Sequence, residues 1–319
     1  MPSTREIRRR IRSVKNINQV TRALEAVSAS SVRKAQAAVL ASRPYAQHAY
    51  DVLVNVAAQT TGVPLHPLLE VRPEVRQIAV VLITGDRGLA GAYNANIVRR
   101  AIRFVEQYER PVRWITVGRK GRDLVRRYIA RLERDETAPA FLRDQQIVAE
   151  FSHLPADPDL GDIAQIAKVV FDEFLTEPVD EVFIAYTNFI NTVTQQPRVL
   201  PLLPLRPFEA RSREIMELVE PDPEVRYRNR DYIYEPSAAA ILNEIIPRFT
   251  ELQILQAIRE SLSSEHSARM VAMRNASESA ESLSGILQLE YNKARQLSIT
   301  NEILDIVGGV EALRQAEAG

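Results

Sequence analysis

A glycine-rich turn is the part of this sequence that comes nearest to a ligand-binding motif. The segment TGDRGLAGAYN (residues 84–94) contains three glycines between an apolar run and a helical pattern. Backbone N–H groups in such turns can hold a phosphate. The spacing, however, is neither GxGxxG nor GxxxxGKS/T, so the residues that a phosphate loop needs are missing. We therefore favour a tight strand-to-helix connection that leaves Asp86 and Arg87 free for a surface contact, with a nucleotide site as the alternative.

Other groups that could do chemistry are few. The chain has no cysteine, which excludes disulfides, zinc–thiolate sites and thiol nucleophiles. It has four histidines, and they show neither HxxxH nor HExxH spacing. No serine lies in a GxSxG motif, and the many acidic residues look like helix-surface charges. We therefore expect no catalytic residue, no metal site and no cofactor.

A basic cluster lies close to the N-terminus, at Arg8, Arg9, Arg10 and Arg12. Such a cluster could bind nucleic acid. No aromatic residues are interleaved with it, and the whole chain is neutral, with 41 basic and 41 acidic residues. We favour a solvated or partner-facing basic collar, and we expect no nucleic-acid partner.

The charges are unevenly distributed along the 319 residues. Residues 1–60 carry ten Lys/Arg and three Asp/Glu, whereas residues 237–319 carry seven and eleven. Ends of opposite sign can pair with each other or face a common partner. No run of 18 apolar residues occurs, so we expect no membrane span. The Arg-rich start lacks the apolar core of a secretory signal, and we interpret it as part of the mature protein.

The first 60 residues have the pattern of one long helix. Apolar residues recur at spacings of three and four, and Ser3 with Glu6 suggests a capping box. No glycine occurs before Gly62. Such a helix would be roughly 80 Å long, more than a small domain can cover. The predicted apolar stripe consists of Ile7, Ile11, Val14, Ile17, Val20, Leu24 and Val27.

Residues 236–312 show the same helical character, and we expect this second helix to end at Gly308–Gly309. Two such helices at the two chain ends would pair antiparallel as a coiled coil. Both are rich in Ala and Ser, notably over residues 26–42 and 261–285. This composition fits either a weakly packed coiled coil or a thin shaft that passes through a sleeve without locking to it.

The middle of the chain, residues 70–205, switches to an α/β pattern. It begins with a continuous apolar strand that is expected to be buried, and it ends with a proline-containing edge strand. Residues 206–235 are polar and charged, which predicts an exposed insertion. The expected strands are residues 77–84, 112–118, 179–189 and 197–205, and the expected helices are residues 94–109, 119–130 and 160–175.

Five segments together resemble the gamma subunit of F-type ATP synthase. They are IRSVKNINQVTRALEAVSASSVRKAQ (11–36), ITGDRGLAGAYN (83–94), DYIYEPSAAAIL (231–242), SEHSARMVAMRNASESA (264–280) and LQLEYNKARQLSITNEILDIVGG (287–309). The resemblance covers nearly the whole chain, and its C-terminal block is highly specific. It implies an α/β fold class with a long antiparallel coiled coil of the N- and C-terminal helices and a central Rossmann-like α/β domain.

The resemblance also implies a function. Family members form the central rotor shaft, which proton flow through a membrane ring of c subunits turns inside a hexamer of three alpha and three beta subunits. The shaft forces the catalytic sites of the hexamer through successive conformations and supplies no catalytic group itself. The implied partners are alpha, beta and epsilon subunits and the c ring. The implied location is peripheral, on the cytoplasmic face of the bacterial inner membrane.

Particular residues match positions that the family uses for contacts. Tyr232 and Glu235 match the foot that meets the c ring. The turn of Asp86, Arg87 and Gly88 becomes a contact or a fold element rather than a phosphate loop. The positions implied to contact the hexamer are Arg22, Leu24, Arg269, Gln296, Thr300 and Glu302.

Two departures from the family and two competing functions remain. The cysteine pair of the plant chloroplast form is absent, which excludes thiol control. Residues 206–230 look longer than in short bacterial members, as either a neutral expansion or a contact with epsilon. The competing functions are a generic coiled-coil tether and a small nucleotide-using protein built on residues 77–130.

Overall fold

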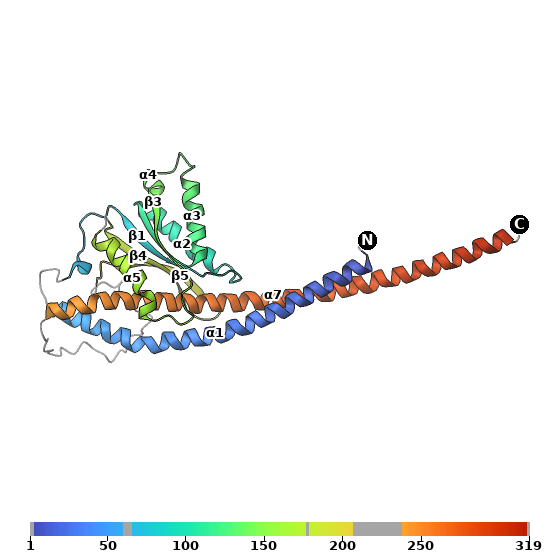
Figure 1. The fold of residues 1–319 in the computed structure, drawn as a ribbon, viewed down its shortest axis with the longest axis horizontal. Coiled ribbons are helices and arrows are strands. Elements are labelled where there is room, and N and C mark those ends of the chain that lie inside the picture. The colour runs from blue at the N-terminus through green and yellow to red at the C-terminus, as the bar shows by residue number, and fades with distance from the viewer. Residues whose placement is uncertain (1–2, 60–65, 177–178, 207–237, 318–319) are drawn as a thin grey trace. The chain divides into compact units, whose positions relative to one another are not determined.

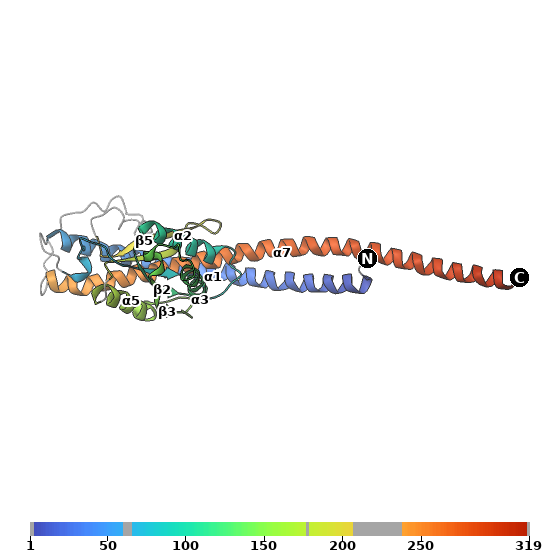
Figure 2. The same ribbon diagram turned by 90° about the horizontal axis from the view of Figure 1, so that it is seen from above.

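The computed structural model describes residues 3–59, 66–176, 179–206 and 238–317. It divides into two compact units. One unit joins residues 1–27 to residues 270–319, and the other comprises residues 28–269. Two long helices contribute to both units: α1 (Thr4–Gln59) and α7 (Ala238–Glu317). Figures 1 and 2 show the ribbon from two directions.

The unit of residues 28–269 is built on a five-stranded sheet with the order β3-β2-β1-β4-β5. The first four strands of this order run parallel, and β5 is antiparallel to β4. All six residues of β1 are buried, as expected for a central strand that is covered on both faces. The strands are β1 (Ile78–Ile83), β2 (Val112–Val117), β3 (Gln145–Phe151), β4 (Glu181–Phe189) and β5 (Gln195–Leu203).

Each face of the sheet has its own apolar core. Alternate residues of β1 point to opposite faces, so Val80 packs in one core and Val81 in the other. Helices α2 (Tyr93–Tyr108) and α3 (Arg119–Leu132) cover the Val80 face. Helix α5 (Leu160–Leu175) and the part of α7 between Leu242 and Ile258 cover the other face. The short elements are η1 (Pro67–Leu69) and α4 (Ala140–Arg143).

The sheet contains one strand more than the sequence predicts. The missed strand is β3, which lies at the parallel edge of the sheet and pairs with β2. Most of its side chains are only partly buried, so the sequence QQIVAEF lacks the apolar run of a central strand. At the opposite edge the prediction of a proline-containing edge strand is confirmed, because β5 is the outer strand and runs antiparallel to β4.

Both long helices are continuous. Helix α1 runs through Pro44, and the predicted N-cap is present, since the Ser3 hydroxyl accepts a hydrogen bond from the Glu6 N–H at 3.3 Å. The Glu6 side chain binds Arg10. The predicted end of the second helix is wrong: α7 continues through Gly308–Gly309 to Glu317. Glycine lowers helix stability by only about 1 kcal/mol relative to alanine, which a long helix can tolerate.

In the unit that joins the two chain ends, α1 and α7 lie side by side and antiparallel (Figures 1 and 2). Ile7 and Ile11 of α1 form a small apolar cluster with Leu287. Farther along the seam the contacts become polar: the Ser277 hydroxyl donates a hydrogen bond to the Thr21 hydroxyl at 2.6 Å. Both hydroxyl-bearing residues are buried. The antiparallel pair predicted from the sequence is therefore present, but its seam is only partly apolar.

Part of the predicted apolar stripe is wrong. Ile17, Val20 and Val27 are more than half exposed, at 52%, 58% and 63%. Beyond Val14, the positions of α1 that are at least partly buried continue at the coiled-coil spacing of four and three. They include Asn18 and Thr21. The sequence pattern instead follows the larger apolar side chains, which drift off this seam onto the exposed surface.

The pair of Thr21 and Ser277 makes the seam testable. Thr21→Val alone should lower the free energy of unfolding by about 1–3 kcal/mol, because the buried Ser277 hydroxyl loses its acceptor. Adding Ser277→Ala should recover most of this loss, since no unpaired hydroxyl then remains. Urea unfolding of the single and double variants measures the coupling, and additive losses would contradict a buried hydrogen bond.

Candidate functional site

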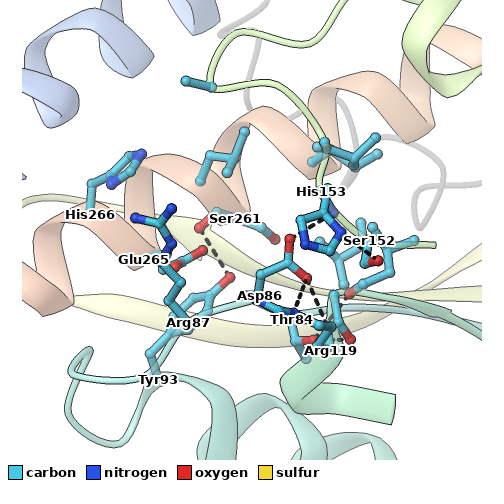
Figure 3. A pocket seen from close by; sticks show the side chains of 18 of the residues that line it. Thr84, Asp86, Arg87, Tyr93, Arg119, Ser152, His153, Ser261, Glu265 and His266 are labelled. Atoms are coloured by element: carbon cyan, nitrogen blue, oxygen red, sulfur yellow. Dashed lines mark hydrogen bonds and ion pairs between the residues drawn. The ribbon is translucent and has the colours of Figure 1, made fainter. Parts of the chain in front are cut away.

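A cavity of about 500 Å³ opens at the carboxyl ends of β1, β2 and β3 (Figure 3). Its walls come from the segments that follow these three strands and from the part of α7 between Ile258 and Arg269. Carboxyl ends of parallel strands, near the point where the strand order reverses, are the usual ligand site of such folds. This sheet reverses between β1 and β4. The cavity is therefore the natural place to look for a binding function.

Thr84, directly after β1, joins the ends of two neighbouring strands. Its hydroxyl donates to the Val117 carbonyl at 3.0 Å and accepts from the Gly121 N–H at 2.9 Å. Gly118 has a φ of +96°, and a Cβ there would lie 2.1 Å from the Thr84 carbonyl oxygen. Only glycine fits this position. The sequence does not single out these residues, because their spacing matches no known motif.

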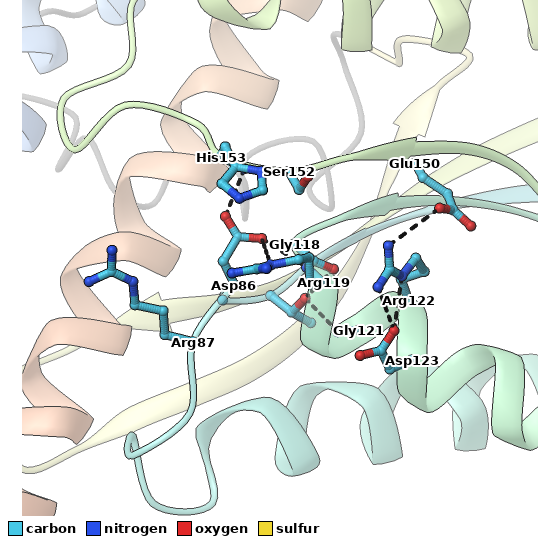
Figure 4. Close-up of polar contacts among 12 residues, drawn as sticks. Asp86, Arg87, Gly118, Arg119, Gly121, Arg122, Asp123, Glu150, Ser152 and His153 are labelled. Carbon is cyan, nitrogen blue, oxygen red and sulfur yellow. Dashed lines mark hydrogen bonds and ion pairs between the residues drawn. The ribbon is translucent and has the colours of Figure 1, made fainter.

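Asp86 ties three strand ends together (Figure 4). One carboxylate oxygen accepts from the backbone N–H of Arg119, at the start of α3, at 2.9 Å. The other accepts from the backbone N–H of His153, after β3, at 2.7 Å. The Arg119 side chain adds an ion pair at 3.8 Å. Asp86 thus supplies the negative charge that a bound phosphate would bring to a helix N-terminus.

The remaining N–H groups at the start of α3 are also used. Lys120 donates to the Gly85 carbonyl at 3.1 Å, and Gly121 donates to Thr84. With the first three N–H groups of α3 engaged inside the protein, this helix end has no free cradle for phosphate. The geometry therefore argues against a phosphate site at the start of α3. It favours the interpretation of the Asp86 turn as a fold element.

Arg87 and Gly88 differ from Asp86 in this turn. Both are exposed, and no atom lies within 4 Å of a Cβ placed on Gly88. Gly88 also lacks a positive φ, so neither space nor backbone geometry requires glycine there. Arg87 lines the cavity mouth as a surface cation. Their predicted role in a contact with a partner stays a prediction.

Helix α7 brings a charged pair into the cavity. The Arg269 guanidinium donates to the Glu265 carboxylate, and the two side chains are only 13% and 10% exposed. Burial raises the pKa of Glu265, while Arg269 acts in the opposite direction. Burial, together with the charge of Arg269, lowers the pKa of His266 from 6.5 to about 4. At neutral pH the His266 ring is therefore uncharged.

The residues predicted to contact a surrounding hexamer occupy different environments. Arg22 is exposed and forms a 2.9 Å ion pair with Glu281, and Leu24 is half-buried. Arg269 turns into the cavity, away from the exposed helix surface. The exposed end of α7 carries Gln296, Thr300 and Glu302. The predicted foot residues, Tyr232 and Glu235, lie outside the described residues, as does nearly all of the 206–230 insertion.

No group of three or more metal-ligating side chains occurs in the part of the chain that the structure describes. No described helix is long and apolar enough to cross a membrane. The cavity itself contains two carboxylates that could hold a cation, Asp86 and Glu265. Each is already engaged, Asp86 by backbone N–H groups and Glu265 by Arg269.

Asp86→Ala should lower the free energy of unfolding by about 2–3 kcal/mol, because two hydrogen bonds to a charged acceptor are lost. Asp123→Ala is the matched control, since Asp123 is about half exposed and its carboxylate pairs with the neighbouring Arg122. The control should cost less than about 1 kcal/mol. Chemical denaturation measures the free energy of unfolding of both variants. Equal losses would contradict a role of Asp86 in joining the three strand ends.

His266 should make stability depend on pH. Its folded pKa lies below its ordinary value, so between pH 6.5 and about 4 the unfolded chain takes up a proton that the folded chain refuses. The free energy of unfolding should therefore fall as the pH drops, by up to about 1.4 kcal/mol per pH unit. His266→Gln should remove this slope in urea unfolding across that range. Glu265 contributes with the opposite sign, so the comparison with the unsubstituted chain isolates His266, and an unchanged slope would contradict the assignment.

Comparisons of the sequence with known proteins agree on one family. The ATP synthase family model matches residues 3–313. An ATP synthase gamma chain of Roseiflexus sp. (strain RS-1) is 44% identical over 318 residues, covering 99% of this chain and all of the relative. The ATP synthase gamma chain of Dehalococcoides mccartyi (strain CBDB1) is 46% identical over 314 residues, covering 98% of this chain and all of the relative.

A solved structure supports the fold. A chain in the Euglena gracilis mitochondrial ATP synthase, in the structure of its OSCP, F1 and c-ring in rotational state 3, matches with a TM-score of 0.58. The match covers 98% of this chain and 95% of that chain at 20% identity, which speaks for the fold alone. The extent and identity of the sequence matches decide the family: the chain belongs to the ATP synthase gamma chains.

Proposed function

We propose that this chain is the central rotor shaft of an F-type ATP synthase. In this function it couples proton-driven rotation of a membrane c ring to conformational cycling of catalytic sites on a hexamer of alpha and beta subunits. The chain supplies no catalytic group. Its work is mechanical, because an asymmetric shaft favours a different conformation of each surrounding subunit as it turns.

The observation that carries this proposal is the bare end of α7. Every described side chain from Arg295 to Val310 is exposed. This stretch nevertheless displays seven large apolar side chains: Leu297, Ile299, Ile303, Leu304, Ile306, Val307 and Val310. Contiguous apolar surface of this kind marks an interaction site. At 100° per residue these apolar side chains spread over about half of the helix circumference, so the partner that covers them has to be broad.

The polar residues on the same stretch suit a contact that breaks and re-forms. Gln296, Thr300 and Glu302 are exposed, and the Thr300 hydroxyl donates to the Gln296 carbonyl of its own helix. Exposed polar and ionic contacts contribute about 0–1 kcal/mol each. Contacts this weak can exchange between successive subunits without trapping the shaft. Arg22 and Leu24 complete the proposed set toward the hexamer. Arg269 is left out of it, because its side chain is only 13% exposed and pairs with Glu265.

The proposal extends to the other partners. We infer three alpha and three beta subunits around the shaft, an epsilon subunit beside it and a c ring below, with Tyr232 and Glu235 in the foot. The complex would be peripheral to the cytoplasmic face of a bacterial inner membrane. No cofactor is needed. Of the competing functions, a nucleotide site at the start of α3 is disfavoured by the engaged N–H groups there, and the tether by the uncovered apolar end of α7.

Reconstitution tests the function. The purified chain should not hydrolyse ATP alone, but with cognate alpha and beta subunits it should co-elute and give ATPase activity. The triple variant Gln296→Ala, Thr300→Ala, Glu302→Ala should assemble and yet pump fewer protons per ATP in membranes, since the altered contacts transmit the shaft position. Its thermal unfolding should match the unsubstituted chain, because all three side chains are exposed.

A chain that fails to co-elute with the cognate subunits would refute the rotor function. A triple variant that pumps normally would leave the tether as the better account of the helices. Hydrolysis of ATP by the chain alone would instead restore the enzyme alternative.

A further inference from the structure

Two serines of α7 bind the backbone of a sheet strand. The N–H of Thr187, on β4, donates to the Ser261 hydroxyl at 3.2 Å. The Ser264 hydroxyl donates to the carbonyl of the same Thr187 at 3.1 Å. All three residues are at most 2% exposed. A helix whose side chains satisfy both backbone groups of one strand residue is bound to that residue directionally.

The backbone N–H and carbonyl of Thr187 depend on these serines, because the neighbouring strands supply no hydrogen-bond partner for them. The last residue pair between β1 and β4 is Leu82 with Ala185, two residues before Thr187. On the other side Thr187 lies opposite Pro197 of β5, but its N–H and carbonyl both face α7, so neither points toward β5. A buried carbonyl or N–H without a partner is costly, so α7 takes the place of the strand that has ended.

Two further contacts join α7 at the same level. The Tyr93 hydroxyl, at the start of α2, donates to the Ser261 carbonyl at 3.0 Å. The Glu265 carboxyl carbon lies 2.6 Å from the position of a Cβ placed on Gly85, so a larger residue there would displace the Glu265 side chain. We call Tyr93, Thr187, Ser261 and Ser264 the crest anchor. It joins α7 to β4 and to α2.

Below the crest anchor, α7 meets the sheet through apolar side chains such as Leu242, Ile246 and Ile258. Apolar packing is strong but non-directional, so by itself it resists a turn of the helix about its axis only through shape. A turn by one residue position is about 100° and would carry both serine hydroxyls away from Thr187. The hydrogen bonds of the crest anchor therefore fix the rotational setting of α7 in a way that the apolar contact does not.

We propose that the crest anchor is where torque passes between the α/β domain and the shaft helix. This inference rests on the proposed rotor function. A load that turns the α/β domain reaches α7 through the paired bonds at Thr187 and through Tyr93, and α7 continues as one helix to Glu317. The four residues are positioning residues, since they touch no substrate.

The first arm of the test uses the full chain alone. Ser261→Ala removes the acceptor of the Thr187 N–H, so hydrogen exchange at that amide should become about fivefold faster. Ser263→Ala is the matched control: Ser263 is equally buried on the same helix, but its hydroxyl bonds to the Arg259 carbonyl of α7 itself at 3.0 Å. The control should leave exchange at Thr187 unchanged.

The second arm uses the assembled complex in membranes. The double variant Ser261→Ala, Ser264→Ala should keep ATP hydrolysis but pump fewer protons per ATP. The reason is that α7 can then rotate relative to the α/β domain under load. Ser263→Ala should pump normally, which separates a transmission role from a general loss of packing. If the double variant does not assemble, Ser264→Ala alone replaces it, with the same expected loss.

Normal pumping by the Ser261/Ser264 variant would overturn the proposal, as would equal loss in the Ser263 control. Unchanged exchange at Thr187 in Ser261→Ala would remove its structural basis. Failure of the rotor function itself is distinguishable, since the unsubstituted chain would then not assemble with alpha and beta subunits.

Discussion

Helix α7 can remain helical over 80 residues only because other parts of the protein cover most of it, since helical propensity alone stabilises little in water. Within the unit of residues 28–269, the sheet face covers it through the second apolar core. In the other unit, α1 covers it through a narrow seam that begins apolar at Ile7 and becomes polar at Thr21. Beyond Arg295 nothing in the described chain covers it. This uncovered apolar stretch is the surface through which we propose that the chain contacts other subunits.

The small polar residues of α7 have a more specific role than a slender outline. Ser261 and Ser264 complete the hydrogen bonding of Thr187, and Ser277 pairs with Thr21 across the helix seam. Directional bonds of this kind define which helix face meets which neighbour. A leucine seam would bind more strongly, but it would tolerate rotation and sliding more easily. The two interpretations of the Ala/Ser composition, weak packing or a thin shaft, therefore leave out what these serines bind.

The glycine-rich turn after β1 shows how a chain can place its own carboxylate at a helix N-terminus. The strand order, the cavity and the helix N-terminus are all in the expected places. Asp86, however, supplies the negative charge from within the chain, and Thr84 and Gly85 engage two further N–H groups of α3. The fold positions a site, but the side chains decide whether a ligand is needed there. Here the side chains join the segments that follow β1, β2 and β3 to one another.

The sequence by itself determined the elements whose patterns are local. The long helices, the buried strand β1 and the proline-marked edge strand β5 follow from periodicity and composition, and the ordered motifs at both ends identify the family. Strand β3 escaped detection because an edge strand is half exposed and lacks an apolar run. The helix seam escaped because burial follows the coiled-coil repeat through Asn18 and Thr21, whereas the larger apolar residues drift off it.

Only the tertiary structure decided which polar groups meet. Asp86 lies 67 residues from His153, and Thr187 lies 77 residues from Ser264. Arg269, which the resemblance placed on a contact surface, is turned inward to Glu265. The physical reason is that a hydrogen bond depends on the position of two atoms to within a few tenths of an ångström. A sequence pattern fixes the face on which a residue lies, and only the packing of distant elements fixes its partner.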